Sequence, residues 1–139
     1  MFGRVHHVGF VVTELAAAER HFLALGYVRH GQVVEDPYQR AQLVFLQRED
    51  ASAGEPLVEL IHPVDEQART HAFTARNQYQ IHHLCYVTED MTTAIAQARA
   101  ARFSQVQPVV AAPAIGGSRI AFFYARPVGL FEVVERPPF

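Results

Sequence analysis

The sequence has few of the features that mark membrane, secreted or disulfide-rich proteins. Its 139 residues include one cysteine, Cys85, so no disulfide can form within the chain. No run of about 18 apolar residues could span a bilayer, and residues 1–13 show no signal-peptide pattern. We therefore expect a cytoplasmic protein with no membrane partner. Because Cys85 lies in an apolar stretch, the sequence favours a buried structural thiol over a nucleophile.

A surplus of positive charge is also missing. Twelve basic residues oppose 14 acidic ones, which gives a formal net charge of −2, and the basic residues are scattered along the chain. The sequence therefore shows no cluster of basic residues of the kind that binds the phosphates of nucleic acid. A hydrophobic fraction of 50% and an aromatic fraction of 11% are ample for a packed core at this length.

What the sequence does contain is a repeat. A strand-like, alternating stretch at residues 5–12 begins with a β-branched residue and a histidine pair, and a close copy occupies residues 81–88. A second short apolar strand follows each copy, at residues 57–61 and 130–134, and each of these holds one acid, Glu59 or Glu132. Two similar halves therefore carry one histidine and one glutamate each at matching places.

The segments between these strands follow the same order in both halves. Residues 14–25 and 91–101 have the pattern of helices, with Thr13 and Asp90 as the expected N-caps. Further strands are expected at residues 27–34, 40–47, 103–110 and 119–124, and a short helix within 66–75. On the third strand, alternation is expected to turn Gln42, Val44 and Leu46 together to the cavity side.

These elements predict an α+β fold. Residues 1–139 would form one domain of two βαβββ repeats, at about 4–63 and 80–136, joined by a linker at 64–79. One sheet with one helix cannot bury both of its faces, so the two modules should pair into a curved mixed-sheet clamshell with the helices outside. Equivalent positions would then meet near the pseudo-twofold axis.

The duplicated residues that would meet there are His7, Glu59, His83 and Glu132. Imidazole nitrogen and carboxylate oxygen together suit zinc, cobalt, nickel, manganese or ferrous iron better than magnesium or calcium. Two buried carboxylates would otherwise carry a penalty of several kcal/mol, which a dication removes. Strict alternation would send the neighbouring His6 and His82 to the opposite face, as structural or helix-facing residues.

The chain resembles the vicinal oxygen chelate superfamily, and within it the methylmalonyl-CoA epimerase and glyoxalase I groups. The matching segments are His-His-Val-Gly-Phe-Val-Val at 6–12, Val-Glu-Leu-Ile-His-Pro at 58–63, Ile-His-His-Leu-Cys-Tyr-Val at 81–87, Gly-Gly-Ser-Arg-Ile-Ala-Phe-Phe at 116–123 and Gly-Leu-Phe-Glu-Val-Val-Glu at 129–135. The resemblance implies the paired βαβββ fold and metal ligation by His7, Glu59, His83 and Glu132.

It also implies a metal-dependent isomerase or lyase. Such an enzyme would stabilise the enolate or enediolate of a small 2-oxo, hemithioacetal or acyl-thioester substrate, with Glu132 as the first candidate for the base and Glu59 as the second. Epimerases of this type have a further acid on the third strand, where this sequence offers Gln42, which is no Brønsted base.

Two other functions stay open at this point. A metal-free, drug-sequestering protein of the bleomycin-resistance type would use the same clamshell as an apolar cup, but it does not need the four ligands. An extradiol-type dioxygenase needs two histidines and one glutamate on ferrous iron, so Glu59 counts against it. In each case the partner is a small molecule, and the fold leads us to expect a homodimer.

Overall fold

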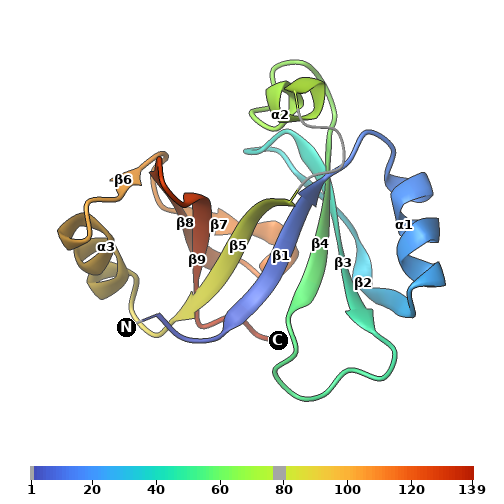
Figure 1. Cartoon of the computed structure of the whole chain (residues 1–139), viewed down its shortest axis with the longest axis horizontal. Coiled ribbons are helices and arrows are strands. Elements are labelled where there is room, and N and C mark those ends of the chain that lie inside the picture. Colours follow the sequence, from blue (N-terminus) through green and yellow to red (C-terminus); the bar gives the residue numbers. More distant parts are fainter. Residues whose placement is uncertain (1, 77–80) are drawn as a thin grey trace.

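Nine strands form a single mixed sheet in a computed structural model that describes residues 2–76 and 81–139 (Figure 1). The path through the sheet is β2-β3-β4-β1-β5-β9-β8-β6, and β7 pairs with β8 off this path. In the first half the elements are β1 (Val5–Val11), α1 (Leu15–Ala24), β2 (Tyr27–Asp36), β3 (Ala41–Arg48) and β4 (Leu57–Pro63). After α2 (His71–Arg76) come β5 (Ile81–Thr88), α3 (Met91–Ala100), β6 (Ser104–Gln105), β7 (Val110–Ala112), a 3-10 turn (Pro113–Ile115), β8 (Ser118–Ala125) and β9 (Gly129–Glu135).

The centre of the sheet is built alike on both sides. β1 and β5 pair antiparallel with each other, while β1 pairs parallel with β4 and β5 pairs parallel with β9. In Figure 1, β1 and β5 run side by side, and α1 and α3 lie far apart on the outer sides of the two halves. The predicted α+β clamshell is therefore confirmed. These matching pairings also support the proposal that 4–63 and 80–136 are two copies of one unit.

The second half departs from the predicted order at one strand. Instead of a continuous strand over 103–110, the chain forms the short β6 and β7 with a break between them. Pro108 lies in this break, and a proline has no N–H to donate to a neighbouring strand. The break leaves Val106 and Gln107 in a loop at the rim of the sheet.

The two long helices begin differently. Asp90 caps α3 as predicted, since its carboxylate accepts hydrogen bonds from the backbone nitrogens of Thr92 and Thr93 at 3.3 and 3.0 Å. The prediction that Thr13 caps the first helix is wrong, because α1 begins at Leu15 with Glu14 in the N-cap position and no side-chain cap. The anchor of α1 is apolar instead: it packs through Leu15, Ala18 and Phe22 against a cluster formed by Val44, Leu46, Val58 and Leu60.

That packing fixes the two faces of β3. Val44 and Leu46 face α1, whereas Phe45 joins an inner cluster with Cys85 and Phe122. Strand alternation puts Gln42 on the helix side with Val44. The prediction that Gln42 faces the cavity is therefore wrong by one residue of register, and β3 presents Leu43 and Phe45 to the interior.

The connection between the halves holds less helix than expected. Within the predicted 66–75 helix and 64–79 linker, the helical part is α2, which begins at His71. Residues 77–79 of the predicted linker, and residue 80 of the predicted second repeat, lie outside the described residues. Across the described ranges, every helix is too short or too polar to cross a bilayer.

Candidate metal centre

Four adjacent central strands each contribute one polar side chain to a common point on the inner face of the sheet. His7 comes from β1, Glu59 from β4, His83 from β5 and Glu132 from β9. The strand register explains the convergence, because Gly9 of β1 lies beside both Glu59 and His83. All four are buried, with exposed fractions of 0–5%. The structure therefore brings together the four residues that the repeat singled out.

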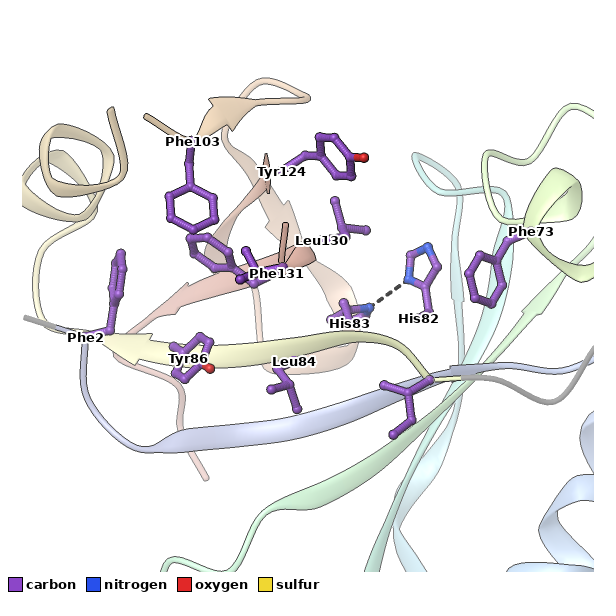
Figure 2. A pocket seen from close by; sticks show the side chains of 13 residues that line it. Phe2, Phe73, His82, His83, Leu84, Tyr86, Phe103, Tyr124, Leu130 and Phe131 are labelled. Carbon is purple, nitrogen blue, oxygen red and sulfur yellow. Dashed lines mark hydrogen bonds between the residues drawn. The ribbon is translucent and has the colours of Figure 1, made fainter. Parts of the chain in front are cut away.

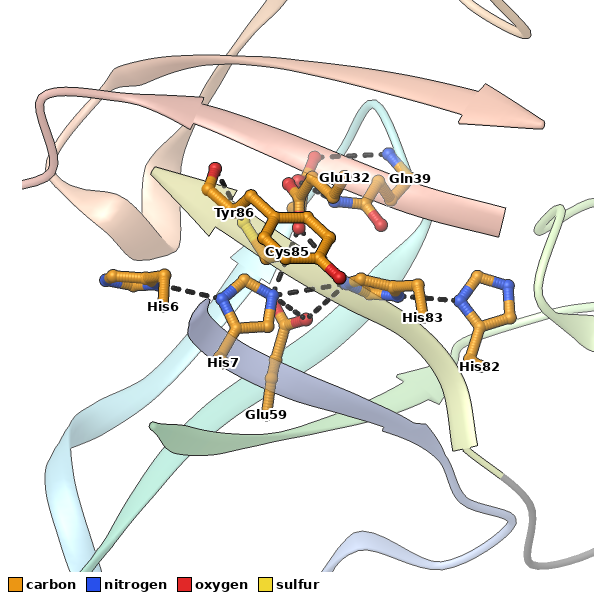
Figure 3. Close-up of polar contacts among 10 residues, drawn as sticks. His6, His7, Gln39, Glu59, His82, His83, Cys85, Tyr86 and Glu132 are labelled. Carbon is orange, nitrogen blue, oxygen red and sulfur yellow. Dashed lines mark hydrogen bonds and ion pairs between the residues drawn. The ribbon is translucent and has the colours of Figure 1, made fainter. Parts of the chain in front are cut away.

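The distances among these side chains are those of ligands around a single ion. His7 Nε2 lies 3.0 Å from Glu132 Oε2, 3.2 Å from Glu59 Oε2 and 3.1 Å from His83 Nε2. His83 Nε2 lies 3.1 Å from Glu132 Oε2 and 3.6 Å from Glu59 Oε2. Bonds of about 2.1 Å hold neighbouring ligand atoms about 3.0 Å apart in an octahedron and about 3.4 Å apart in a tetrahedron. The donor set and its spacing therefore fit a divalent cation (Figure 3).

The electrostatics of the site favour a positive charge at its centre. Burial opposes ionisation of Glu132, but hydrogen bonds from His7 and His83 hold its pKa below the usual range. Burial likewise opposes protonation of His7, yet the neighbouring carboxylates of Glu59 and Glu132 raise the pKa of His7 well above the usual value. Among the described residues, the ion pairs of Glu59 and Glu132 are with these two histidines alone. A dication can take the place of the proton that His7 would otherwise hold.

Each ligand histidine lies over a small residue of the opposite central strand. A Cβ on Gly9 would come within 2.4 Å of His83 Cε1, so the ring of His83 occupies the space that any side chain there would need. In the other half, His7 pairs with Cys85 in the ladder. Sequence reasoning did not assign this role to Gly9. The signal was present: a glycine or cysteine stands two residues after the second histidine of each pair.

Cys85 is buried, as predicted, and its sulfur does not belong to the group of four candidate ligand atoms. The Cys85 sulfur and ring nitrogens of His6 and His7 form a second group of potential metal-ligand atoms. His7 belongs both to this group and to the group of four described above. Burial raises the pKa of the Cys85 thiol far above its usual value, as expected for a structural thiol.

His6 and His82, the outer histidines of the two pairs, do not follow the strict alternation of side chains along a strand. Register shifts between Val5 and His7 on β1, and opposite Gly9 and Phe10 on β5, insert one extra residue into each strand, at His6 and at His82. These β-bulges turn His6 and His82 toward the ligands: His6 Nδ1 lies 2.8 Å from His7 Nδ1, and His82 Nδ1 lies 2.9 Å from His83 Nδ1. The prediction that both face away is wrong.

Two cavities border the centre. The larger, about 890 Å³, is an apolar cleft along β5 and β9; it is lined by aromatic and aliphatic side chains and reaches His82 and His83 (Figure 2). The smaller, about 90 Å³, lies between the turn after β2, the segment before α2 and the loop before β7; its lining is mostly apolar but includes the polar side chains of Gln39, Arg69, Thr70, His82 and Gln107 beside Phe122. Phe122 stands opposite Glu132 in the β8–β9 ladder and packs against His83, so one side chain separates this smaller pocket from the candidate ligands.

Comparison with known proteins identifies the class. A family model described as the Glyoxalase/Bleomycin resistance protein/Dioxygenase superfamily matches residues 6–122, and the chain belongs to this superfamily. This confirms the resemblance to the vicinal oxygen chelate proteins.

Within the superfamily, the chain is similar to several epimerases. The ethylmalonyl-CoA/methylmalonyl-CoA epimerase of Cereibacter sphaeroides is 28% identical over 95 residues, which cover 68% of this chain and 67% of that protein. The crystal structure of methylmalonyl-CoA epimerase from Mycobacterium tuberculosis aligns with a TM-score of 0.83 and 21% identity, over 97% of this chain and 89% of that one. A Streptomyces coelicolor methylmalonyl-CoA epimerase variant, in complex with 2-nitronate-propionyl-CoA, gives 0.84 and 22%, over 97% and 98%. The structural matches establish the fold.

Proposed function

We propose that the protein is a metal-dependent isomerase that moves a proton at the carbon next to the carbonyl of an acyl-thioester substrate. The observation that carries this proposal is the cluster of His7, Glu59, His83 and Glu132 at ligand spacing. The relation to an epimerase of acyl-CoA thioesters supports the substrate class. The bound cation would supply Lewis acidity to neighbouring oxygens of the substrate, which makes the adjacent carbon more acidic. The four ligands count against a metal-free drug-binding role.

Glu132 is the proposed base. Its low pKa keeps it ionised, but hydrogen bonds to His7 and His83 also make it a weak proton acceptor. Proton transfer therefore requires Glu132 to leave these contacts when substrate binds. Glu59 is the proposed second catalytic carboxylate. Its longer contacts to the histidines, 3.2 and 3.6 Å, hold it less tightly.

The two carboxylates are proposed to serve opposite faces of a substrate. Glu59 and Glu132 lie on opposite sides of the pair formed by His7 and His83 (Figure 3). The third strand brings Leu43 and Phe45, and no acid, to the interior. In this protein the second proton position of an epimerisation therefore falls to Glu59.

The smaller pocket is the proposed entrance for the acyl group. Thr70 Oγ1 and Gln107 Nε2 are buried there without a hydrogen-bond partner within the described ranges, and Arg69 adds a positive charge. All three are hydrogen-bond donors, and the lining contains no carboxylate. A carbonyl or carboxylate oxygen of the substrate would satisfy these donors beside the ligands.

The apolar cleft is the proposed contact between two copies of the chain. Among the large side chains on its wall, Ile81 is 56% exposed, Val128 69% and Tyr124 44%, more than expected for a surface in permanent contact with water. A homodimer that covers these side chains remains the prediction. Sedimentation of wild type and a Val128→Asp variant tests it: the variant should shift toward monomer, and a wild-type monomer would contradict it.

Isotope exchange tests the proposed reaction. With cobalt added to the purified protein, deuterium from solvent should enter the carbon next to the carbonyl of a carboxyacyl-CoA thioester such as methylmalonyl-CoA. Exchange should fall to background in Glu132→Gln while bound cobalt stays within a few-fold of wild type. Wild-type protein that binds cobalt but exchanges no proton in any acyl-thioester would overturn the proposal.

A further inference from the structure

Four imidazole rings form a row across the two central strands, in the order His6, His7, His83, His82 (Figure 3). The outer contacts join Nδ1 atoms, at 2.8 Å for His6 with His7 and 2.9 Å for His82 with His83. The inner contact joins Nε2 of His7 to Nε2 of His83 at 3.1 Å. Each ligand ring therefore turns Nδ1 toward its sequence neighbour and Nε2 toward the carboxylates.

One end of the row fixes where a proton lies. His6 Nε2 is 3.0 Å from the backbone oxygen of Phe139, and this oxygen can only accept. His6 Nε2 therefore carries the hydrogen, which leaves the Nδ1 of a neutral His6 ring as an acceptor. The hydrogen between His6 and His7 must then belong to His7 Nδ1. A neutral His7 ring in this tautomer has its lone pair on Nε2, which faces Glu59 and Glu132.

The other end repeats the arrangement without the carbonyl. His82 Nδ1 contacts His83 Nδ1, and its ring lies edge-on to Phe73 with ring centres 4.9 Å apart. His82 is also part of the wall of both cavities. Because the β-bulges bring both outer rings to the ligand side, the chain departs from regular pairing twice, once for each histidine pair.

We propose that His6 and His82 are positioning residues: each accepts the Nδ1–H of the adjacent ligand histidine, and together they present the Nε2 lone pairs of His7 and His83 to one cation. A hydrogen bond at the far nitrogen also orients a ligand ring and makes it a better donor, and loss of such a partner typically weakens metal binding 10–100-fold. The inference rests on the metal centre of the proposed function but not on the reaction.

Metal affinity and tautomer state test it together. Cobalt affinity is measured by competition with a chelator for wild type, His82→Leu and His82→Asn. Leucine removes the acceptor and should weaken cobalt binding about 10–100-fold. Asparagine keeps an oxygen near the position of Nδ1 and should restore most of the affinity. His62→Leu is the matched control, since His62 contacts the backbone oxygen of Val12 away from the centre, and its affinity should equal that of wild type.

A nitrogen-15 NMR spectrum of the zinc-loaded wild-type protein tests the inference without any variant, and so does not depend on whether the variants fold. Nitrogen-15 NMR should show Nδ1–H on His7 and His83 and Nε2–H on His6. The opposite tautomer at His6, or wild-type affinity in His82→Leu, would overturn the inference and leave the proposed function standing. Wild-type protein that binds neither cobalt nor zinc would instead refute the metal centre itself.

Discussion

The two halves of the sheet deliver the same pair of candidate ligands, one histidine and one glutamate each, but differ in how the site is closed around them. In the first half, the outer histidine is sealed: His6 is fully buried, bonds to Phe139 and packs on Phe45. In the second half, the corresponding His82 is only partly buried and faces both cavities. The duplication therefore supplies a symmetric donor set, and in the function proposed above the asymmetry of the surroundings leaves the second half as the side from which substrate approaches.

The largest expected effect separates the two carboxylates. Glu132→Gln should lower proton exchange by about 10²–10⁴-fold, because it removes the group proposed as base. Glu59→Gln should lower exchange less, since Glu59 is the second proton position. The rate of deuterium uptake by an acyl-CoA thioester measures both. Equal losses would show that the halves share the base role.

The next comparison concerns the small residues beneath the ligand rings. Gly9→Ala should weaken cobalt binding by at least about 100-fold, because its Cβ would meet the ring of His83 at 2.4 Å and force it off the ion. Cys85→Ala, the corresponding change in the other half, removes an atom instead of adding one. Its affinity should stay within about threefold of wild type by the same chelator competition. Tight cobalt binding by Gly9→Ala would contradict this account of His83.

The buried His6 should change how the free energy of unfolding depends on pH. Burial, with His7 as the next cause, lowers the pKa of His6 from 6.5 to about 4. Between pH 6.5 and pH 4 the His6 side chain binds a proton more readily in the unfolded chain than in the folded one. The contribution of His6 to the free energy of unfolding is therefore complete above pH 6.5 and is lost as the pH falls toward 4. The loss amounts to about 3 kcal/mol.

Chemical denaturation of the metal-free protein at several pH values measures this loss. His6→Asn should lose less stability over the interval than wild type, whereas His62→Asn should follow wild type. An unchanged slope in His6→Asn would show that the ring does not titrate as its burial requires.

The smallest effect compares the helix ends. Asp90→Ala should cost about 1 kcal/mol of unfolding free energy, because it removes the side-chain cap of α3. Thr13→Ala should change stability by less than about 0.5 kcal/mol, since α1 has no side-chain cap to lose. Thermal unfolding of the two variants decides the comparison, and a larger loss in Thr13→Ala would reverse it.

The sequence predicts the strands and the four converging residues because a duplication carries more information than any single pattern. One histidine on a strand says little, but His7 and His83 at equivalent places, each followed by an acid on a later strand, require a common centre. The same reasoning failed at His6 and His82. It assumed unbroken alternation, and a β-bulge leaves no clear mark in the local sequence.

Other features escaped prediction because they depend on contacts between distant segments. The side of the sheet that Gln42 faces is set by the packing of α1 on Val44 and Leu46, and a one-residue error in register reverses the face. The smaller pocket is assembled from three loops and from residues of β5, β8 and β9, and the partner of His6 is Phe139, 133 residues away. The break between β6 and β7 could have been predicted from Pro108 in the sequence, because proline seldom lies within a paired strand.

Anomalous diffraction from crystals grown with cobalt tests the account most directly, because it locates the ion without assuming any reaction. We expect a single strong peak per chain, about 2.1 Å from Nε2 of His7 and His83 and within bonding distance of Glu59 and Glu132. No peak between these four side chains, or cobalt bound elsewhere while they contact one another alone, would contradict the metal centre and the function proposed from it.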